Sequence, residues 1–214
     1  MKTRLHTVLA GPLLMLLWTT SAIAGTIFNN NANPPTNFPY SDSNAGQILA
    51  DDFSLTAGQN TIGDVHWTGR YYTGNTTDAF SIYVCGDTPG KPNNICAPLT
   101  FLSAVTRTLN VSNPNNIYFD YAVDVSALTV TASATQWLSI YNTTGGWLWG
   151  AKLGGNAMQT NNFSPIAPPD TTWVSNSLAM DFQLTGVPEP CTLAFLGTGL
   201  AGLVALSRRR KARA

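Results

Sequence analysis

The chain has 214 residues, of which 11 are basic and 11 acidic. Seven of the basic residues lie in its first four or last seven positions, so residues 25–186 hold four basic residues against ten aspartates, a net charge of −6. Nucleic-acid binding requires Lys and Arg to neutralise phosphates, so this charge argues against a nucleic acid, and equally against an anionic membrane surface, as partner. About 160 residues suffice for one domain with a sizeable core.

The first 24 residues have the order of a secretory signal peptide. Lys2 and Arg4 precede an apolar run, and Ala22 and Ala24 supply the small-x-small pattern that signal peptidase reads. Cleavage after Ala24 would make Gly25 the first residue of the mature chain. The alternative is a buried N-terminal helix, which would leave this order of charge, apolar run and cleavage pattern without a reason.

Between Gly25 and Gly186, apolar and polar residues alternate in many short stretches, as is typical of β-strands. The clearest are FSIYV, IYFDYAV and LAMDFQL. In the last of these we expect four residues to face the core and two to face solvent: Leu178, Met180, Phe182 and Leu184 inside, Asp181 and Gln183 outside. Further strands are expected at 48–55, 62–70, 105–111, 128–132 and 136–141, between turn-rich stretches such as TPGKPNN and TTGG. This pattern predicts an all-β fold, an antiparallel β-sandwich or barrel.

Cys85 and Cys96 are the two cysteines of this region. Export favours disulfides, and the turn-rich residues after Cys85 could return the chain to within bridging distance. Closing a loop of about a dozen residues stabilises the fold by roughly 2–3 kcal/mol in the chain-entropy description. We therefore expect a Cys85–Cys96 disulfide, and the alternative is two free, buried thiols.

The stretch TTGGWLWG carries Trp147 and Trp149 two residues apart. In an extended chain both indoles point to one face, about 7 Å apart, and the flanking glycines would leave their faces open to stack on sugar rings. Trp67, Tyr71 and Tyr72 of HWTGRYY could complete this platform. The alternative is that these tryptophans belong to the core, since large aromatic side chains dominate protein cores.

Residues suited to catalysis or metal binding are scarce. The region holds one histidine, His66, and no glutamate, and it has no G-x-S-x-G motif. Glycosidases usually need two convergent carboxylates, whereas the adjacent Asp51 and Asp52 point to opposite faces of a strand. Calcium held by Asp51, Asp52 and Asp181 is the remaining metal candidate, and the default is solvated aspartates. We predict no catalytic site and no cofactor.

The last 28 residues form a separate unit. Val187 and the Pro-Glu-Pro after it are followed by 17 uncharged residues, 191–207, and then by five basic residues within 208–214. Seventeen helical residues span about 25 Å, close to a hydrocarbon core of roughly 30 Å, and a basic cluster prefers the cytoplasmic side. We therefore predict one transmembrane helix with the domain outside and the tail inside. The alternative is a core helix with a solvated basic end.

The order Val187-Pro188-Glu189-Pro190, apolar helix and Arg-rich end resembles the PEP-CTERM sorting signal of exopolysaccharide-producing Gram-negative bacteria. The resemblance implies that an exosortase, a membrane-embedded cysteine transpeptidase, removes the helix and tail and releases or re-anchors the domain at the cell surface or in the extracellular matrix. Cys191 departs from the Ser, Ala or Thr that usually follows the motif, and we expect it to be unpaired.

Within the domain, LADDFSL, TIGDVHWTGRYY, DAFSIYV and LAMDFQLTG resemble the β-sandwich often found ahead of such signals, which is similar to jelly-roll carbohydrate-binding modules. The resemblance implies a jelly-roll-like β-sandwich over residues 25–186. Two functions remain open: the domain binds carbohydrate, such as the cell's own exopolysaccharide, or it is a structural matrix protein without a specific ligand site. A glycan-active enzyme is a more distant alternative.

Overall fold

The computed structural model describes residues 25–30, 34–72, 77–110, 117–161 and 173–187. The predicted signal peptide, 1–24, and the predicted transmembrane helix, 191–207, lie outside these residues. Within the described part of the chain, no helix has the length and apolar character needed to cross a bilayer.

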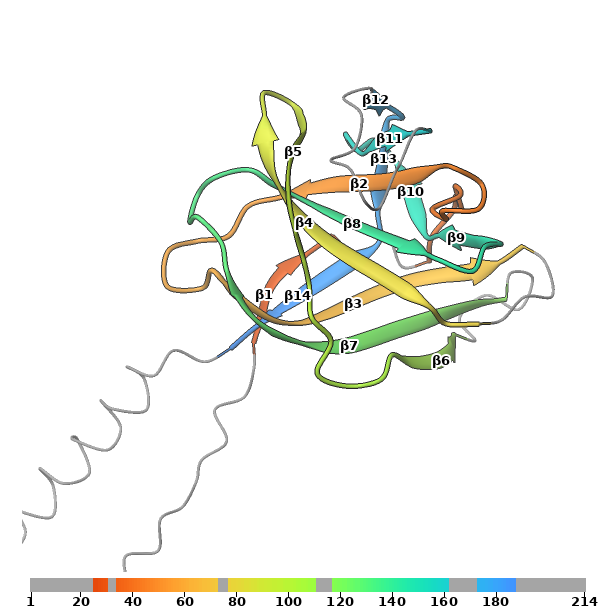
Figure 1. Cartoon of the computed structure of the whole chain (residues 1–214), viewed down its shortest axis with the longest axis horizontal. Helices are drawn as coiled ribbons and strands as arrows, with labels where there is room; N and C mark the ends of the chain where they lie inside the picture. The colour runs from red at the N-terminus through yellow and green to blue at the C-terminus, as the bar shows by residue number, and fades with distance from the viewer. Residues whose placement is uncertain (1–24, 31–33, 73–76, 111–116, 162–172, 188–214) are drawn as a thin grey trace, which may run out of the picture.

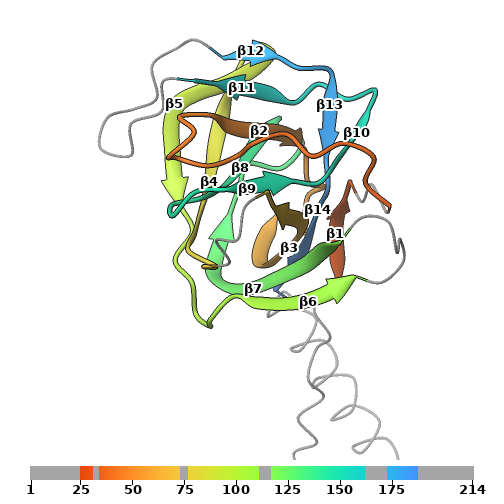
Figure 2. The same ribbon diagram turned by 90° about the vertical axis from the view of Figure 1, so that its right-hand side faces the viewer.

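Two antiparallel sheets make up most of the described domain (Figures 1 and 2). The first sheet has the order β1 (Thr26–Asn29), β14 (Phe182–Gly186), β3 (Thr61–Tyr71), β7 (Tyr118–Thr129) and β6 (Thr106–Asn110), and β9 (Trp147–Trp149) also pairs with β3. The second has the order β12 (Val174–Ser175), β11 (Met158–Thr160), β2 (Ile48–Phe53), β8 (Gln136–Asn142), β4 (Phe80–Thr88) and β5 (Lys91–Pro98). A short pair joins β10 (Ala151–Leu153) to β13 (Leu178–Met180). The all-β, sandwich-like prediction is confirmed, and the jelly-roll arrangement stays a prediction.

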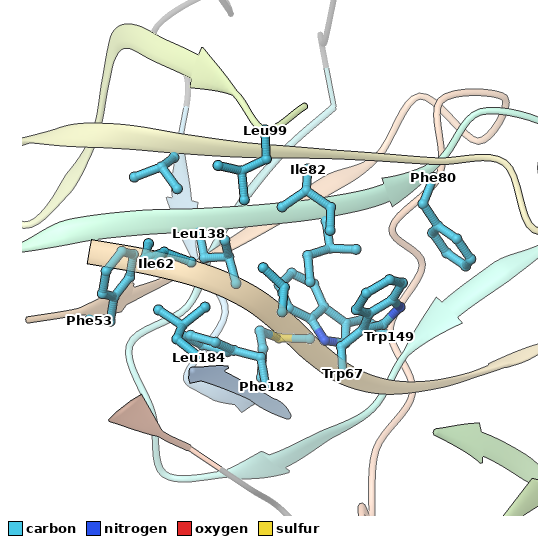
Figure 3. Close-up of a cluster of buried hydrophobic side chains, with 14 of the residues drawn as sticks. Phe53, Ile62, Trp67, Phe80, Ile82, Leu99, Leu138, Trp149, Phe182 and Leu184 are labelled. Carbon is cyan, nitrogen blue, oxygen red and sulfur yellow. The ribbon is translucent and has the colours of Figure 1, made fainter. Parts of the chain in front are cut away.

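The main core lies between the two sheets (Figure 3). Strand residues alternate between the two faces of a sheet, so each central strand contributes every second side chain to this core. On β4 these are Phe80, Ile82 and Val84, the face that the FSIYV pattern predicts. Phe182 and Leu184 of β14 meet them from the first sheet, and both are at most 1% exposed.

The second sheet is also covered on its other face. Ile48, Ala50, Trp137, Tyr141 and Met158 form a second buried cluster there, together with Trp173 and Cys85. Burial on both faces is consistent with the sequences of β2 and β8, ILADDF and QWLSIYN, in which apolar residues stand next to one another instead of alternating strictly.

Three local predictions are corrected. The stretch LAMDFQL is two strands, β13 and β14, interrupted at Asp181, whose side chain is buried rather than outside. Of the expected strand 128–132, only Leu128 and Thr129 are strand, and they are the end of β7, a single strand of 12 residues. The stretch TPGKPNN is mostly strand, because Thr88 pairs with Lys91 across a two-residue turn in which Gly90 has a φ of 76°. Glycine adopts this left-handed conformation without the strain that a Cβ would bring.

Cys85 on β4 and Cys96 on β5 occupy directly opposite positions of this hairpin, and the structure joins them in a disulfide. Their Cα atoms are 4.0 Å apart. The bridge therefore ties the edge strand β5 to the interior strand β4.

Both ends of the described domain meet at one end of the first sheet (Figure 1). The strands β1 and β14 pair with each other, and the amide of Gly186 donates to the carbonyl of Gly25 at 2.9 Å. The next amide, that of Val187, donates to the carbonyl of Thr61 at 3.2 Å. We call this the terminal end of the domain, and the end at which β3 finishes the distal end.

Candidate functional site

The two predicted processing sites flank the described domain. Gly25 and Val187 belong to it, while Ala22, Ala24, Pro188, Glu189 and Pro190 lie outside the described residues. Val187 is the last described residue and keeps its hydrogen bond to β3. The Pro-Glu-Pro of the sorting motif therefore begins one residue after the last hydrogen bond that the structure describes.

The predicted tryptophan platform is wrong, because its rings are not accessible. Trp147 and Trp149 are 0% exposed and Trp67 is 2% exposed. The ring of Trp147 packs edge-on against Phe80 at 5.0 Å, and the indole nitrogen of Trp149 donates to the carbonyl of Asp181 at 3.0 Å. These side chains are core, as the alternative interpretation holds.

The covering of β9 on both faces has two causes. On one face, Gly69 of β3 allows a close approach, since a Cβ there would lie 2.5 Å from the Trp147 ring. On the other, Leu148 is 3% exposed because the segment around Tyr40 pairs with it. The amide of Trp149 also donates to the carbonyl of Pro39 at 2.9 Å. The isolated WLW alternation could not show that a segment more than 100 residues earlier covers Leu148.

Tyr71 and Tyr72 point in different directions. The hydroxyl of Tyr71 lies 2.8 Å from a carboxylate oxygen of Asp78, which also accepts from Arg107 at 3.1 Å. Burial, reinforced by the hydrogen bond to Asp78, raises the pKa of Tyr71 above its ordinary range. Tyr71 thus connects the end of β3 to the segment around Asp78, whereas the side chain of Tyr72 is 69% exposed.

Tyr72 belongs to a group of aromatic and charged side chains near the distal end, which we call the distal face: Phe38, Tyr40, Arg70, Tyr72 and Asp120. The rings of Tyr40 and Tyr72 meet edge to face at 5.9 Å, and the guanidinium of Arg70 lies 4.3 Å above the Phe38 ring. Arg70 and Tyr72 alternate with inward-facing residues of β3, so both lie on its outer side.

Two further bonds hold Asp120 on β7. Its carboxylate accepts from the Thr68 hydroxyl at 3.1 Å and from the Asn110 amide at 2.8 Å. Sequence reasoning finds Tyr72 but misses Phe38 and Tyr40, because their segment has no strand periodicity. Its only signal is the pair of aromatic residues on either side of Pro39.

The calcium candidates do not form a metal site. Asp51 is 1% exposed, and one of its carboxylate oxygens accepts from the Met180 amide at 2.7 Å and the Asn30 side chain at 2.8 Å. Burial raises the pKa of Asp51 to about 7. Among the described residues, no three His, Cys, Asp or Glu side chains gather where they could hold a metal ion. Asp51 instead links β2 to β13 and to the residue after β1.

His66 pairs with its neighbour two residues back along β3. Its Nε2 atom lies 3.1 Å from a carboxylate oxygen of Asp64, and this hydrogen bond raises the pKa of the imidazole. Both side chains are partly exposed. His66 and Asp64 can therefore form an ion pair at the surface, on the outer face of the first sheet.

A shallow groove runs beside the start of β4. Its volume is about 140 Å³, and it is lined by uncharged residues: Phe80, Ser81, Ile82, Tyr83, Pro98, Leu99 and Phe101. Pockets that enclose drug-sized ligands measure roughly 300–1,000 Å³, so this groove is too small for one. The distal face is accordingly the better candidate for ligand binding.

The described domain is an all-β sandwich whose first and last strands pair with each other, and the predicted sorting signal follows the last strand. Residues 186–211 match the family model of the PEP-CTERM protein-sorting motif. The chain is therefore an exported protein that an exosortase sorts to the cell surface. No curated protein matches the chain.

Proposed function

We propose that the chain is a polysaccharide-binding protein of the bacterial surface or extracellular matrix. Signal peptidase removes residues 1–24, and residues 191–207 hold the precursor as a single membrane span with its C-terminus in the cytoplasm. An exosortase then cuts near Pro188-Glu189-Pro190 and releases or re-anchors the domain. The sorting motif supports the second half of this sequence of events.

The observation that carries the binding proposal is the exposed ring of Tyr72 within the distal face. Tyr72 is 69% exposed although it is large and aromatic, and its edge contact with Tyr40 restricts its orientation. An aromatic ring can stack on the C–H face of a pyranose while its hydroxyl hydrogen-bonds. Arg70, two residues before Tyr72, supplies donors for sugar hydroxyls, and Asp120, opposite Thr68 on β7, supplies acceptors farther along the same face.

The position of the distal face suits a ligand outside the cell. The strand β3 runs 11 residues from Thr61 at the terminal end to Tyr71, a distance of about 35 Å at the usual rise per strand residue. A domain tethered through Val187 therefore presents Tyr72 away from the membrane and toward the surrounding matrix.

Affinity electrophoresis of the domain in gels that contain bacterial exopolysaccharide tests the proposal. We expect Tyr72→Ala to weaken binding at least tenfold with little change in thermal stability, and Tyr72→Phe to retain most of it because the ring remains. The matched control is Ile95→Ala on β5, which truncates a side chain that is 80% exposed in the other sheet.

Two outcomes contradict the proposal. Unchanged retardation of Tyr72→Ala would show that the distal face binds no glycan. Absence of retardation of the unaltered domain across a panel of acidic and neutral polysaccharides would favour the structural matrix protein without a specific ligand site.

A further inference from the structure

Two segments without charge lie at the terminal end of the domain. They are residues 54–61, which run from β2 to the first residue of β3, and residues 129–135, which run from the last residue of β7 to β8, and we call them the collar. Neither segment contains a charged residue, although residues 25–186 hold ten aspartates and four basic residues. The charges at this end of the second sheet, Asp87 and Lys91, lie in the β4–β5 hairpin, where Asp87 accepts from the Trp137 indole at 2.8 Å. Most of the collar is exposed, including Ala57, Gln59 and Thr131.

The two halves of the collar are joined by hydrogen bonds. The amide of Val130 donates to the carbonyl of Asn60 at 2.9 Å, and the Asn60 side chain donates to the carbonyl of Val130 at 2.6 Å. The amide of Ser133 donates to the carbonyl of Leu55 at 2.8 Å. The collar is therefore one surface with a defined shape.

The sorting motif leaves the domain from this surface. The amide of Val187 donates to the carbonyl of Thr61, which is itself a collar residue. The side chain of Val187 lies against Gly63, where an added Cβ would come within 2.6 Å of its Cγ2 atom. The last residue before Pro188 is thus held against β3.

Little chain separates the collar from the uncharged stretch 191–207. Three residues, 188–190, lie between Val187 and Cys191, so Val187 lies at most about 14 Å from the start of that stretch. The polar headgroup layer of a leaflet is roughly 5–8 Å thick. If 191–207 spans the membrane, as the proposed function requires, the collar lies within reach of the lipid headgroups.

We propose that the collar is a membrane-facing surface that rests on the lipid headgroups of the outer leaflet until the exosortase acts. A domain of net charge −6 would be repelled by anionic lipids if its carboxylates faced them. On the strands that enter the collar, Asp52, Asp64 and Asp124 are set back two, three and five residues from it. The collar instead offers hydroxyl, amide and backbone groups that hydrogen-bond to headgroups.

Quenching by headgroup-labelled lipid tests this placement. The chain from Gly25 to Ala214, with Cys191→Ser to remove the tail thiol, is reconstituted in phosphatidylethanolamine–phosphatidylglycerol vesicles that contain a nitroxide headgroup lipid. A fluorophore on Gln59→Cys is expected to be quenched several-fold more than the same fluorophore on Ala97→Cys, an exposed position on β5. Equal quenching at the two positions would overturn the proposal.

Charge variants test the electrostatic reason. With the probe at position 59, Ala57→Asp combined with Thr131→Asp should reduce quenching, whereas Ala57→Lys with Thr131→Lys should preserve or increase it. The two pairs place charges of opposite sign at the same two exposed positions, so an equal loss in both would contradict the charge argument.

Two further results would show whether the membrane span or the contact of the collar with lipid is the part that fails. Release of the chain from the vesicles by alkaline extraction would show that residues 191–207 do not span, which defeats the proposed precursor as well. Retention of the chain in the vesicles without stronger quenching at position 59 would leave the proposed membrane span in place. It would overturn only the contact of the collar with lipid headgroups.

Discussion

Trp147→Ala is expected to lower the free energy of unfolding by about 3–5 kcal/mol, the usual cost of truncating a large aromatic side chain in a core. Trp147 is 0% exposed, and its ring contacts Phe80 at 5.0 Å and Tyr121 at 6.3 Å. The ring also covers Gly69, so its removal would leave a cavity next to a position that has no side chain to fill it.

Urea unfolding of the oxidised domain measures this loss, and Tyr72→Ala is its control. Both substitutions remove an aromatic ring from a neighbouring part of the first sheet, but Tyr72 is 69% exposed and should cost less than about 1 kcal/mol. A similar small cost for Trp147→Ala would mean that the ring is not core, and the tryptophan platform would have to be reconsidered.

The second large expected effect is a dependence of stability on pH that comes from Asp51. Its pKa is about 7 in the folded domain, mainly because burial disfavours the charged carboxylate, against 3.8 as the ordinary value. Below pH 4 the carboxyl is protonated in both the folded and the unfolded chain. As the pH rises toward 7 the unfolded chain releases the proton and the folded domain retains it. The contribution of Asp51 to stability is therefore greatest below pH 4 and is lost as the pH rises through 7.

The expected loss is on the order of 4 kcal/mol between pH 4 and pH 8, because each unit of pKa difference corresponds to about 1.4 kcal/mol. Asp51→Asn cannot titrate and should remove most of this slope in urea titrations across that range. Asp52→Asn is the matched control, since its side chain is less buried. Its charge adds to the raised pKa of Asp51, but burial is the main cause, so this substitution should leave most of the slope in place. A slope that survives Asp51→Asn would assign the pH dependence to another group.

Local alternation is enough to predict most of the strands. FSIYV places Phe80, Ile82 and Val84 in the core, and the same period places Met180, Phe182 and Leu184 there. These predictions succeed because one face of each strand meets the facing sheet, so the sequence itself carries the pattern.

The burial of Leu148 and Asp181, which the sequence pattern does not predict, depends on segments that are distant in the chain. The buried face of Leu148 is covered by residues around Tyr40, and Asp181 is buried where β13 passes into β14 beside Gly150, whose carbonyl accepts from the Asp181 amide at 2.8 Å. Neither contact has a local periodicity. Of the five aromatic residues predicted to form the platform, Tyr71 lies partly outside the core and Tyr72 largely outside it. The local sequence pattern does not separate these two from the three buried tryptophans.

The distal face and the collar likewise arise from chain segments that meet only in the fold. Tyr40 meets Tyr72, and Phe38 meets Arg70, across more than 30 residues, and the collar combines two connections about 70 residues apart. The sorting motif could be predicted because its residues are contiguous. The distal face could not, because its geometry is set by packing.

The intact mass of the exported protein tests the central claim that this domain is a processed exosortase substrate. We expect a mature chain that begins at Gly25 and ends near Pro188-Glu189-Pro190 in cells that contain the exosortase, and a chain that keeps its C-terminal segment in cells that lack it. A mature protein that still ended in Ala214 in cells with an active exosortase would contradict the account.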